Sequence, residues 1–463
     1  MKSFSKTEIR ELTKYVQSPC FNQRADVTQL FEYLARHHGG TPSVFQKEIA
    51  FLELFPDKQY DDALMRFLMH NLMKVIKLYM IQKEIESSDT DYQIYLARAM
   101  RKRGFDENFE KEINLAQEVN VQNIFRNADF YFKNYRIEIE KLEHITLIRR
   151  KGIMPFQEVF DALSSFFVIE TLRYSCFALP YQSAQNQKYE LPFLTQIIDW
   201  IEKNNLFSDS NKKNQNIAVL TYFNAYKALT TKELKYFNEL RKLLHDNWMI
   251  FPENECRFIY LQAMNLCISR INAGENSYLN DYFDLMQSGL KNKRLFENGI
   301  LSKFTYKNAV AAALRLEKFD WVKRFLEEYK FFLHPKDKEA AYNFNLATFH
   351  YRSKNYSNAL KFLQFADFGD VQTNLDARSI QLRIYFEISE TEALKSLLDS
   401  TQIYLQRQKG LGYLKDNYMN LIKFMRKIIR INFDDKVQRN KLLHEIIETK
   451  NVVEKDWLIE KLQ

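Results

Sequence analysis

Glycine and proline are scarce in this chain, and that scarcity limits the folds open to it. Ten of the 463 residues are glycine and eight are proline, about a third of the frequencies usual in globular proteins. Sheet proteins and glycine-lined cofactor sites need many tight turns and many backbone positions with positive φ. We therefore expect long helices joined by short loops, which is an all-α fold.

Charge and cysteine usage limit the compartment and the partners. The formal charge of +8 is small for this length and is spread along the chain, whereas nucleic-acid-binding proteins usually concentrate their basic residues. The first residues, MKSFSKTEIREL, lack the apolar core of a secretory signal, and the absence of a run of about 18 apolar residues predicts no membrane span. The cysteines show no CxxC pair, so we expect reduced, buried thiols in a cytoplasmic protein: Cys20, Cys176, Cys256 and Cys267.

The N-terminal half shows helical periodicity. Residues 1–86 predict four helices, and the last one runs from Asp61 to about Ile85 with acidic residues at its start, where a helix favours them. Residues 87–214 predict longer helices, including 122–150 and 155–180. The helix that starts at Asp61 must bury one side, because apolar residues recur in it at helical spacing: Leu64, Leu68, Leu72, Val75, Ile76 and Tyr79.

The C-terminal half carries a repeated pattern, which is clearest in NLATFHYRSKNYSNALKFLQFAD, residues 345–367. Small residues at Ala347 and Ala359 would let two antiparallel helices approach closely, while larger side chains fill the groove between them. The pair Ala359 and Leu363 recurs 34 residues later as Ala393 and Leu397. An earlier copy, 37 residues upstream, pairs Val322 with Leu326. We expect stacked helical hairpins.

This pattern resembles the tetratricopeptide repeat over about 300–405, with departures at His350 and in the missing closing proline. The resemblance implies an α-solenoid of antiparallel helical hairpins, in which the first helix of each hairpin lines a concave groove that binds a peptide. Carried onto this chain, the groove positions are Lys307, Arg315, Phe344, Tyr351, Arg352, Arg378 and Tyr385. Cations and rings would suit a peptide with acidic groups or a C-terminal carboxylate.

A second resemblance concerns the N-terminal part. The stretches KYVQSPCFNQ and LFPDKQYDDALMRFLMHNLMKVI are similar to a group of uncharacterised bacterial helical-repeat proteins, which implies no activity. We expect an N-terminal helical domain at 1–86, degenerate long-helix hairpins at 87–214, tetratricopeptide-like repeats at 215–408, and C-terminal helices at 409–463. The last segment is interpreted as a cap that covers the final apolar edge; the alternatives are a dimerisation helix and a cover over the groove.

Several short motifs resemble catalytic or metal-binding signatures but lack the other residues that such sites need. HEIIE (444–448) has a glutamate where a zinc-binding HExxH needs its second histidine, and DFGD (367–370) lacks every other kinase motif. GLG (410–412) lacks the third glycine of a dinucleotide site, and the pair His37 and His38 has no nearby partner of its type. We expect no cofactor, no metal and no enzymatic activity.

Basic residues line one face of two predicted helices. Arg66, His70, Lys74 and Lys77 share a face, as do Lys423, Arg426, Lys427 and Arg430, and RAMRKRGF (98–105) is a denser cluster. Such rows suit phosphates or acidic peptides. The alternative is the solvated face that every amphipathic helix has.

Two functions follow as hypotheses. The first is a non-enzymatic scaffold that binds a partner protein or peptide, possibly acidic, in the groove. The second is a nucleic-acid-linked regulator whose DNA-binding head is residues 1–86. Residues 1–85 hold 12 Lys or Arg and 10 Asp or Glu, a net charge of only +2, which disfavours the second. An enzyme with a dispersed site has no feature in its favour, and the sequence leaves the oligomeric state open.

Overall fold

The computed structural model describes residues 3–148, 154–185, 188–204, 217–231, 233–364, 368, 370–408 and 412–463. The chain folds as two compact units, residues 1–222 and 223–463, which are described separately here. The protein is 79% helical and 1% strand, so the predicted all-α class is confirmed. Within the described residues the strands are limited to one short hairpin, β1 (Phe296–Glu297) and β2 (Ile300–Leu301).

The first 86 residues form four helices around a core of their own, as the sequence predicts. The long fourth helix begins where expected, because the side chain of Asp61 accepts hydrogen bonds from the backbone N–H groups of Ala63 and Leu64, at 2.9 and 3.0 Å. It buries Leu68, Leu72, Val75, Ile76 and Tyr79 against the others. The helices are α1 (Lys6–Gln17), α2 (Ala25–Arg36), α3 (Lys47–Leu54) and α4 (Asp62–Glu86), with a 3₁₀ turn at Pro42–Phe45.

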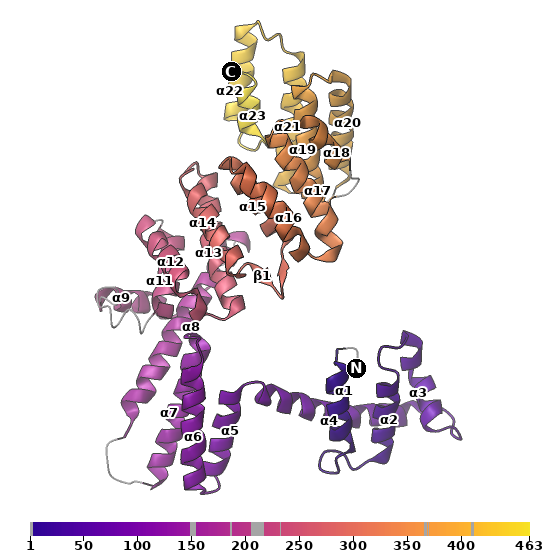
Figure 1. Cartoon of the computed structure of the whole chain (residues 1–463), viewed down its shortest axis with the longest axis vertical. Helices are drawn as coiled ribbons and strands as arrows, with labels where there is room; N and C mark the ends of the chain where they lie inside the picture. The colour runs from indigo at the N-terminus through magenta and orange to yellow at the C-terminus, as the bar shows by residue number, and fades with distance from the viewer. Residues whose placement is uncertain are drawn as a thin grey trace. The chain divides into compact units, whose positions relative to one another are not determined.

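Longer helices complete the first unit. They pair as neighbours, α5 with α6 and α7 with α8, as Figure 1 shows. Glu140 of α7 is 1% exposed and receives the guanidinium groups of both Arg98 and Arg101 from α5. The helices are α5 (Asp89–Arg101), α6 (Asp106–Gln122), α7 (Ala128–Ile148), α8 (Phe156–Gln185) and α9 (Leu194–Lys203). The predicted loop at 208–216 lies outside the described residues.

By length and composition, α8 could cross a membrane. Within Phe156–Gln182, an 18-residue window reaches a mean hydropathy of 1.2, and 28% of that window is buried within the protein. A core helix of a soluble protein passes the same test, and one such helix is weak evidence for a membrane. α8 carries a paired Glu170 and Arg173, three residues apart, so a soluble protein is compatible with this helix.

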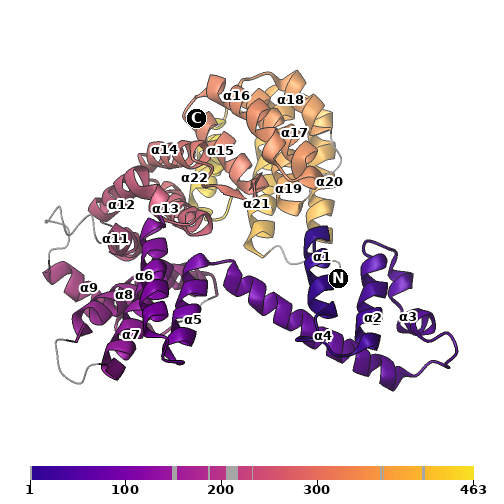
Figure 2. The same cartoon turned by 60° about the horizontal axis from the view of Figure 1, so that its bottom comes forward.

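The second unit is a succession of helical hairpins, α13 with α14, α15 with α16, α17 with α18, and α19 with α20. Figure 2 shows the hairpins α17–α18 and α19–α20 of this unit side by side. Its helices are α12 (Leu234–Asn247), α13 (Glu253–Asn272), α14 (Tyr278–Lys291), α15 (Lys303–Arg315), α16 (Phe319–Tyr329), α17 (Pro335–Arg352), α18 (Tyr356–Leu363), α19 (Val371–Glu387), α20 (Thr391–Arg407), α21 (Tyr413–Arg430), α22 (Lys436–Glu448) and α23 (Lys455–Glu460), with α11 (Ile217–Thr231) containing the boundary between the units and 3₁₀ turns at Trp248–Ile250 and Lys330–Phe332.

One turn geometry closes each of these hairpins. Glu317, Lys354 and Ser389 have φ between 56° and 60°, in the left-handed region. The next residue donates its N–H to a carbonyl five residues back in all three turns, at 2.8–2.9 Å, which is the Schellman hydrogen bond that ends a helix. Gly104 and Gly274 occupy the same place in the α5–α6 and α13–α14 turns. The repeat is therefore visible in the backbone as well as in the sequence.

Burial confirms most of the predicted repeat register and corrects one copy. Ala347, Ala359 and Leu363 are at most 2% exposed and share a core cluster, and the upstream copies Val322 and Leu326 are equally buried. In α20, however, the fully buried residues are Leu394 and Leu398, each one position after the predicted Ala393 and Leu397. The reason is that burial follows the count from the helix start: Ala359 and Leu394 are each the fourth residue of their helix.

Candidate interaction surface

The groove predicted from the repeat is bridged from side to side at Lys307. Its ammonium group pairs with Asp376 of α19 and lies 5.2 Å from the ring centre of Phe344 on α17. Tyr418 of α21 donates its hydroxyl to the same carboxylate, and burial together with this carboxylate raises the pKa of the phenol. Phe344 itself is 4% exposed and packs on Phe368. Phe344 is therefore closed to a partner, and Lys307, 26% exposed, is already paired with Asp376.

The C-terminal helices cover the next part of the groove. Tyr351 lies 4.6 Å beneath the guanidinium of Arg383, and Arg383 pairs with Glu454 at the start of α23. The indole of Trp457 donates to Glu387 at 3.0 Å. Around Tyr351, these contacts agree with one of the alternatives considered for the C-terminal segment, a cover over the groove.

The other predicted groove residues differ in how far they are engaged. Arg315 donates to Asn276 at 3.2 Å. Arg378 lies 5.0 Å over the ring of Tyr404, and Tyr385 is half-buried against the C-terminal core. Arg352 is exposed, and its side chain makes no ion pair or hydrogen bond with any other described residue. Of the seven, only Arg352 remains fully available, and the binding role of the set stays a prediction.

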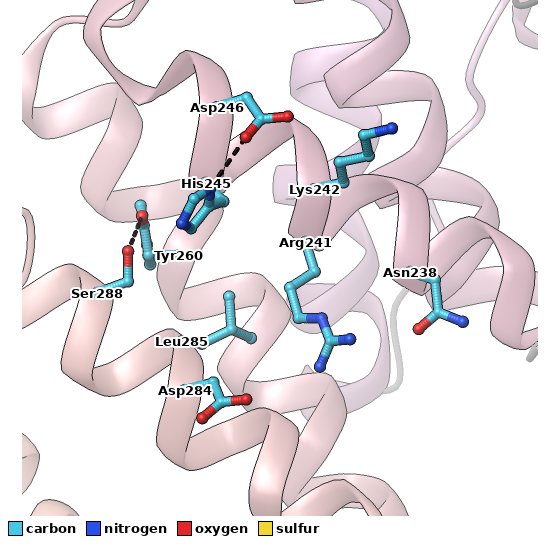
Figure 3. Close-up of a pocket in the computed structure, with 9 residues that line it drawn as sticks. All are labelled: Asn238, Arg241, Lys242, His245, Asp246, Tyr260, Asp284, Leu285 and Ser288. Carbon is cyan, nitrogen blue, oxygen red and sulfur yellow. Dashed lines mark hydrogen bonds and ion pairs between the residues drawn. The ribbon is translucent and has the colours of Figure 1, made fainter.

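An open hollow lies instead between α12 and α14, over the middle of α13. Its volume is about 420 Å³. Figure 3 shows Arg241 from α12 and Asp284 from α14 extending into the space between the helices. Arg241 pairs with Asp281, whereas Asp284 is exposed and has no partner among the described residues. The hollow therefore presents a carboxylate that is free to receive a cation.

A buried tyrosine forms the floor of this hollow. Tyr260 of α13 is completely buried, and its hydroxyl lies 3.1 Å from Oγ of Ser288 on α14; burial raises the pKa of this phenol. At the rim, Nδ1 of His245 lies 2.9 Å from Oδ1 of Asp246, and Lys242 is exposed without a partner in the described chain. Charges of both signs thus surround a neutral, fixed floor.

A second hollow lies on the other side of α14, against α16. Its volume is about 280 Å³, and Trp321, Arg324 and Glu328 of α16 line it together with Lys291. The ring of Trp321 stacks on Phe325 at 4.8 Å. The two hollows flank one helix, so an extended chain that crosses α14 could place side chains in both.

Another hollow, of about 1050 Å³, lies in the first unit between α7, α8 and α9. Its wall includes Phe167, Phe193 and Trp200, each at least 43% exposed. Phe193 precedes α9 with a φ of 61° and meets Phe167 edge to face at 6.2 Å. Nothing in the described residues indicates what fills this apolar space, so it supports no assignment.

The basic rows predicted from the sequence have different environments. In α4, His70, Lys74 and Lys77 are exposed without ion pairs in the described chain, and Arg66 pairs with Asp62 at 2.6 Å. In α21, Lys423 and Lys427 both hold Glu445, Arg426 pairs with Asp399, and Arg430 is exposed. The 98–105 cluster is partly internal, because Arg98 and Arg101 bind the buried Glu140.

The residues of the catalytic look-alike motifs have structural contacts. His37 and His38 each have a ring nitrogen 2.9 Å from a backbone carbonyl. Asp370 accepts from the N–H of Thr373 at the start of α19, while residues 367, 369, 410 and 411 lie outside the described part. Glu445 of HEIIE holds two lysines. In the part of the chain that the structure describes, no group of three or more His, Cys, Asp or Glu side chains is placed to hold a metal ion.

The four cysteines are unpaired, and one differs from expectation. Cys176, Cys256 and Cys267 are buried, and burial raises the pKa of all three thiols, to about 12 for the last two. Cys20 is exposed, because it lies in the turn after α1 rather than on an inward helix face. The expectation of buried thiols is thus wrong for Cys20.

Comparison with models of known protein families gives no match. Neither curated proteins nor solved structures give a significant match to the chain. The interpretation of its surfaces therefore rests on the chain itself.

Proposed function

We propose that this protein is a non-enzymatic, cytoplasmic interaction scaffold, a tetratricopeptide-like solenoid that binds a segment of a partner protein. The recurring hairpins and their shared turn geometry support the solenoid, since stacked hairpins generate extended binding surfaces. The observation that carries the proposal is the pair of hollows on either side of α14. They remain open, whereas the first-helix groove is bridged by Lys307 and Asp376.

The occupant is an extended peptide with side chains of both charge signs. A helix is about 10 Å across with its side chains, and an extended chain advances about 3.3 Å per residue. A segment of a few residues therefore crosses α14. A basic side chain would pair with Asp284, and an acidic one would meet Arg324 or Lys291 beside the indole of Trp321. Exposed hydrogen-bonding groups and one large ring are common features of such sites.

The test uses the full chain as bait in a lysate of its source cells, with recovered proteins quantified by mass spectrometry. Asp284→Lys reverses the exposed carboxylate of the first hollow, and Arg324→Glu reverses a cation of the second. Lys361→Glu is the matched control, because Lys361 is an exposed, unpaired residue on α18, away from both hollows. We expect the two hollow variants to lose the same proteins, at least about fivefold, and the control to retain them.

The variant Arg352→Glu distinguishes binding at the two hollows from binding in the groove that the resemblance predicts. If recovery falls for Arg352→Glu and is unchanged for Asp284→Lys, the partner binds on the first-helix side and the assignment to the hollows is wrong. If no protein is enriched by the unmodified bait, the scaffold function itself is contradicted.

The nucleic-acid alternative has one observation in its favour, the exposed cations of α4. A titration of the full chain against duplex DNA at two salt concentrations decides it, because phosphate contacts make affinity fall steeply with salt. The absence of salt-dependent binding removes this alternative.

A further inference from the structure

The outer face of α4 is unusually apolar for an exposed helix surface. Met69, Met73 and Met80 are 41%, 50% and 53% exposed. These methionines lie at the edge of the buried side of α4. Ile76 occupies the position between Met73 and Met80 on the same face, and it is only 8% exposed. The order 69, 73, 76, 80 alternates steps of four and three residues, which is the spacing of the apolar positions in a coiled coil. α4 therefore offers a row suited to a second helix.

Methionine in such a row favours a binding surface. Its unbranched, polarizable side chain adapts to irregular neighbours and is frequent on surfaces that bind helices. The row from Met69 to Met80 spans about 16 Å at 1.5 Å per residue, enough for three turns of a docked helix. The three methionines lie beside the core of α1–α4, and Ile76 between them is part of that core.

Most of the charge beside this row is positive, and the exposed Glu84, one turn after Met80, is the acidic exception. Residues 63–83 contain no aspartate or glutamate. Lys77 lies four residues after Met73 and three before Met80, so it flanks the row on the solvent side, as His70 does one turn earlier. Both are exposed and have no ion pair in the described chain. Charges at these flanking positions set the choice of partner in paired helices.

We propose that the methionine row of α4, with His70 and Lys77 at its edge, docks an amphipathic helix of a partner protein that carries acidic residues beside its apolar stripe. The apolar row requires an apolar stripe in return, and the unpaired ammonium group of Lys77 requires a carboxylate. This surface goes beyond the proposed function, since it lies in α4 and the hollows lie in residues 223–463. Either can fail without the other.

A nucleic acid fits this surface less well. Phosphates would pair with the cations but would leave the three methionines in water, and groups that grip phosphates are usually polar throughout. Exposed Phe67, Leu78 and Ile81 lie on another face of the same helix, beyond His70 and Lys77, and are not part of the row. DNA is therefore an outcome of the test rather than part of the proposal.

The test is a fluorescence anisotropy titration of the full chain with a labelled synthetic helix. The probe has three heptads, with leucine at both apolar positions and glutamate at both flanking positions, so that like-charge repulsion keeps it from pairing with itself. We expect saturable binding that weakens with added salt. Lys77→Glu and Met73→Asp should each weaken it about tenfold or more, and Lys111→Glu, at an exposed, unpaired lysine of α6, should leave it unchanged.

Controls keep each outcome decisive. Circular dichroism verifies that the variants remain folded, and Met73→Ala, which keeps a helix-favouring residue, must weaken binding if Met73→Asp does. Equal binding of a probe with permuted residues, or equal affinity of the Lys77, Met73 and Lys111 variants, overturns the proposal. So does displacement of the probe by duplex DNA at comparable concentration, or sedimentation as a dimer whose formation Met73→Asp abolishes, because a second copy would then occupy the face.

Discussion

Arg383 and Glu454, 71 residues apart in the chain, form a two-pronged ion pair. Nη1 donates to Oε2 and Nη2 lies beside Oε1, both at 2.9 Å. Arg383 is only 8% exposed, and its other face lies on the ring of Tyr351. The pair thus ties the start of α23 to the C-terminal part of α19 and holds the C-terminal helices over the first-helix side.

Removing Glu454 should loosen the C-terminal helices selectively. Glu454→Ala leaves a buried guanidinium without its partner, and such a loss costs about 3–5 kcal/mol. Hydrogen exchange of the full chain, followed by mass spectrometry, should show α22 and α23 losing protection while α1–α4 keep theirs. Glu460→Ala is the control, because Glu460 is 70% exposed and should cost under about 0.5 kcal/mol. Equal effects of the two substitutions would contradict the tether.

Glu140 should be the most sensitive acidic residue of α7. It is 1% exposed between two arginines of α5. Glu140→Ala would leave Arg98 unpaired and Arg101 with Glu143 alone, at a cost of about 3–5 kcal/mol. Glu143 also meets Arg101 but is 52% exposed, so Glu143→Ala should cost under about 1 kcal/mol. Exchange protection of α5 and α7 measures both, and the prediction is wrong if the order is reversed.

The hairpin turns should respond in opposite ways to glycine and alanine. Lys354 has a φ of 57°, where a side chain is disfavoured by about 1–2 kcal/mol. Lys354→Gly relieves this but adds freedom to the unfolded chain, so we expect a net gain of about 0.5–1 kcal/mol. Gly104→Ala, at a φ of 73° with open space around it, should lose about 1 kcal/mol. Hydrogen exchange in the flanking helices measures whether each substitution raises or lowers stability. A destabilising Lys354→Gly would contradict the argument.

The contact between α21 and α22 should weaken in acid. Hydrogen bonds from Lys427 and Lys423 lower the pKa of Glu445 below its usual 4.5. A carboxylate with a lowered pKa in the folded state contributes stability that is present above pH 4.5 and is lost as the pH falls through the folded value. Because the group is near the surface, we expect less than about 1 kcal/mol.

Glu445→Gln tests this directly. The variant should show less protection than the natural chain in α22 at pH 7, and the difference should shrink as the pH is lowered below 4.5. A difference that is constant with pH would exclude charge as the cause. Glu448→Gln, at an exposed position of the same helix, should match the natural chain throughout.

Much of the helical framework could be predicted from the sequence because it depends on local rules. The start of α4 at Asp61 and its buried row follow from a capping side chain and helical spacing. The shift from Ala393 to Leu394 shows the limit of matching by residue type, since Ala393 looks like Ala359 but lies one place nearer its helix start. Residue type alone does not determine where a helix begins.

The contacts and exposure of the groove residues could not be predicted from any local pattern in the sequence. Lys307 has the spacing of a groove cation, but its partner Asp376 lies 69 residues away, and only the stacking of three first helices brings them together. Similarly, the methionines of α4 have the spacing of core residues, yet what surrounds them is set by α1–α3, which pack on the neighbouring side of the helix. Exposure is a property of the assembled unit.

The reach of Lys303 and Lys307 also limits how this chain can change in length. Lys303 pairs with Asp337, at the start of α17, and with Asp370, just before α19, while Lys307 spans from α15 to α19. The Lys303–Asp370 and Lys307–Asp376 pairs each pass over the single hairpin α17–α18. A duplication or deletion of α17–α18, which repeat proteins commonly tolerate, would move the acids out of reach and leave charges facing the bridged side. A chain with one hairpin more or fewer here would therefore lose the ion pairs of Lys303 with Asp370 and of Lys307 with Asp376.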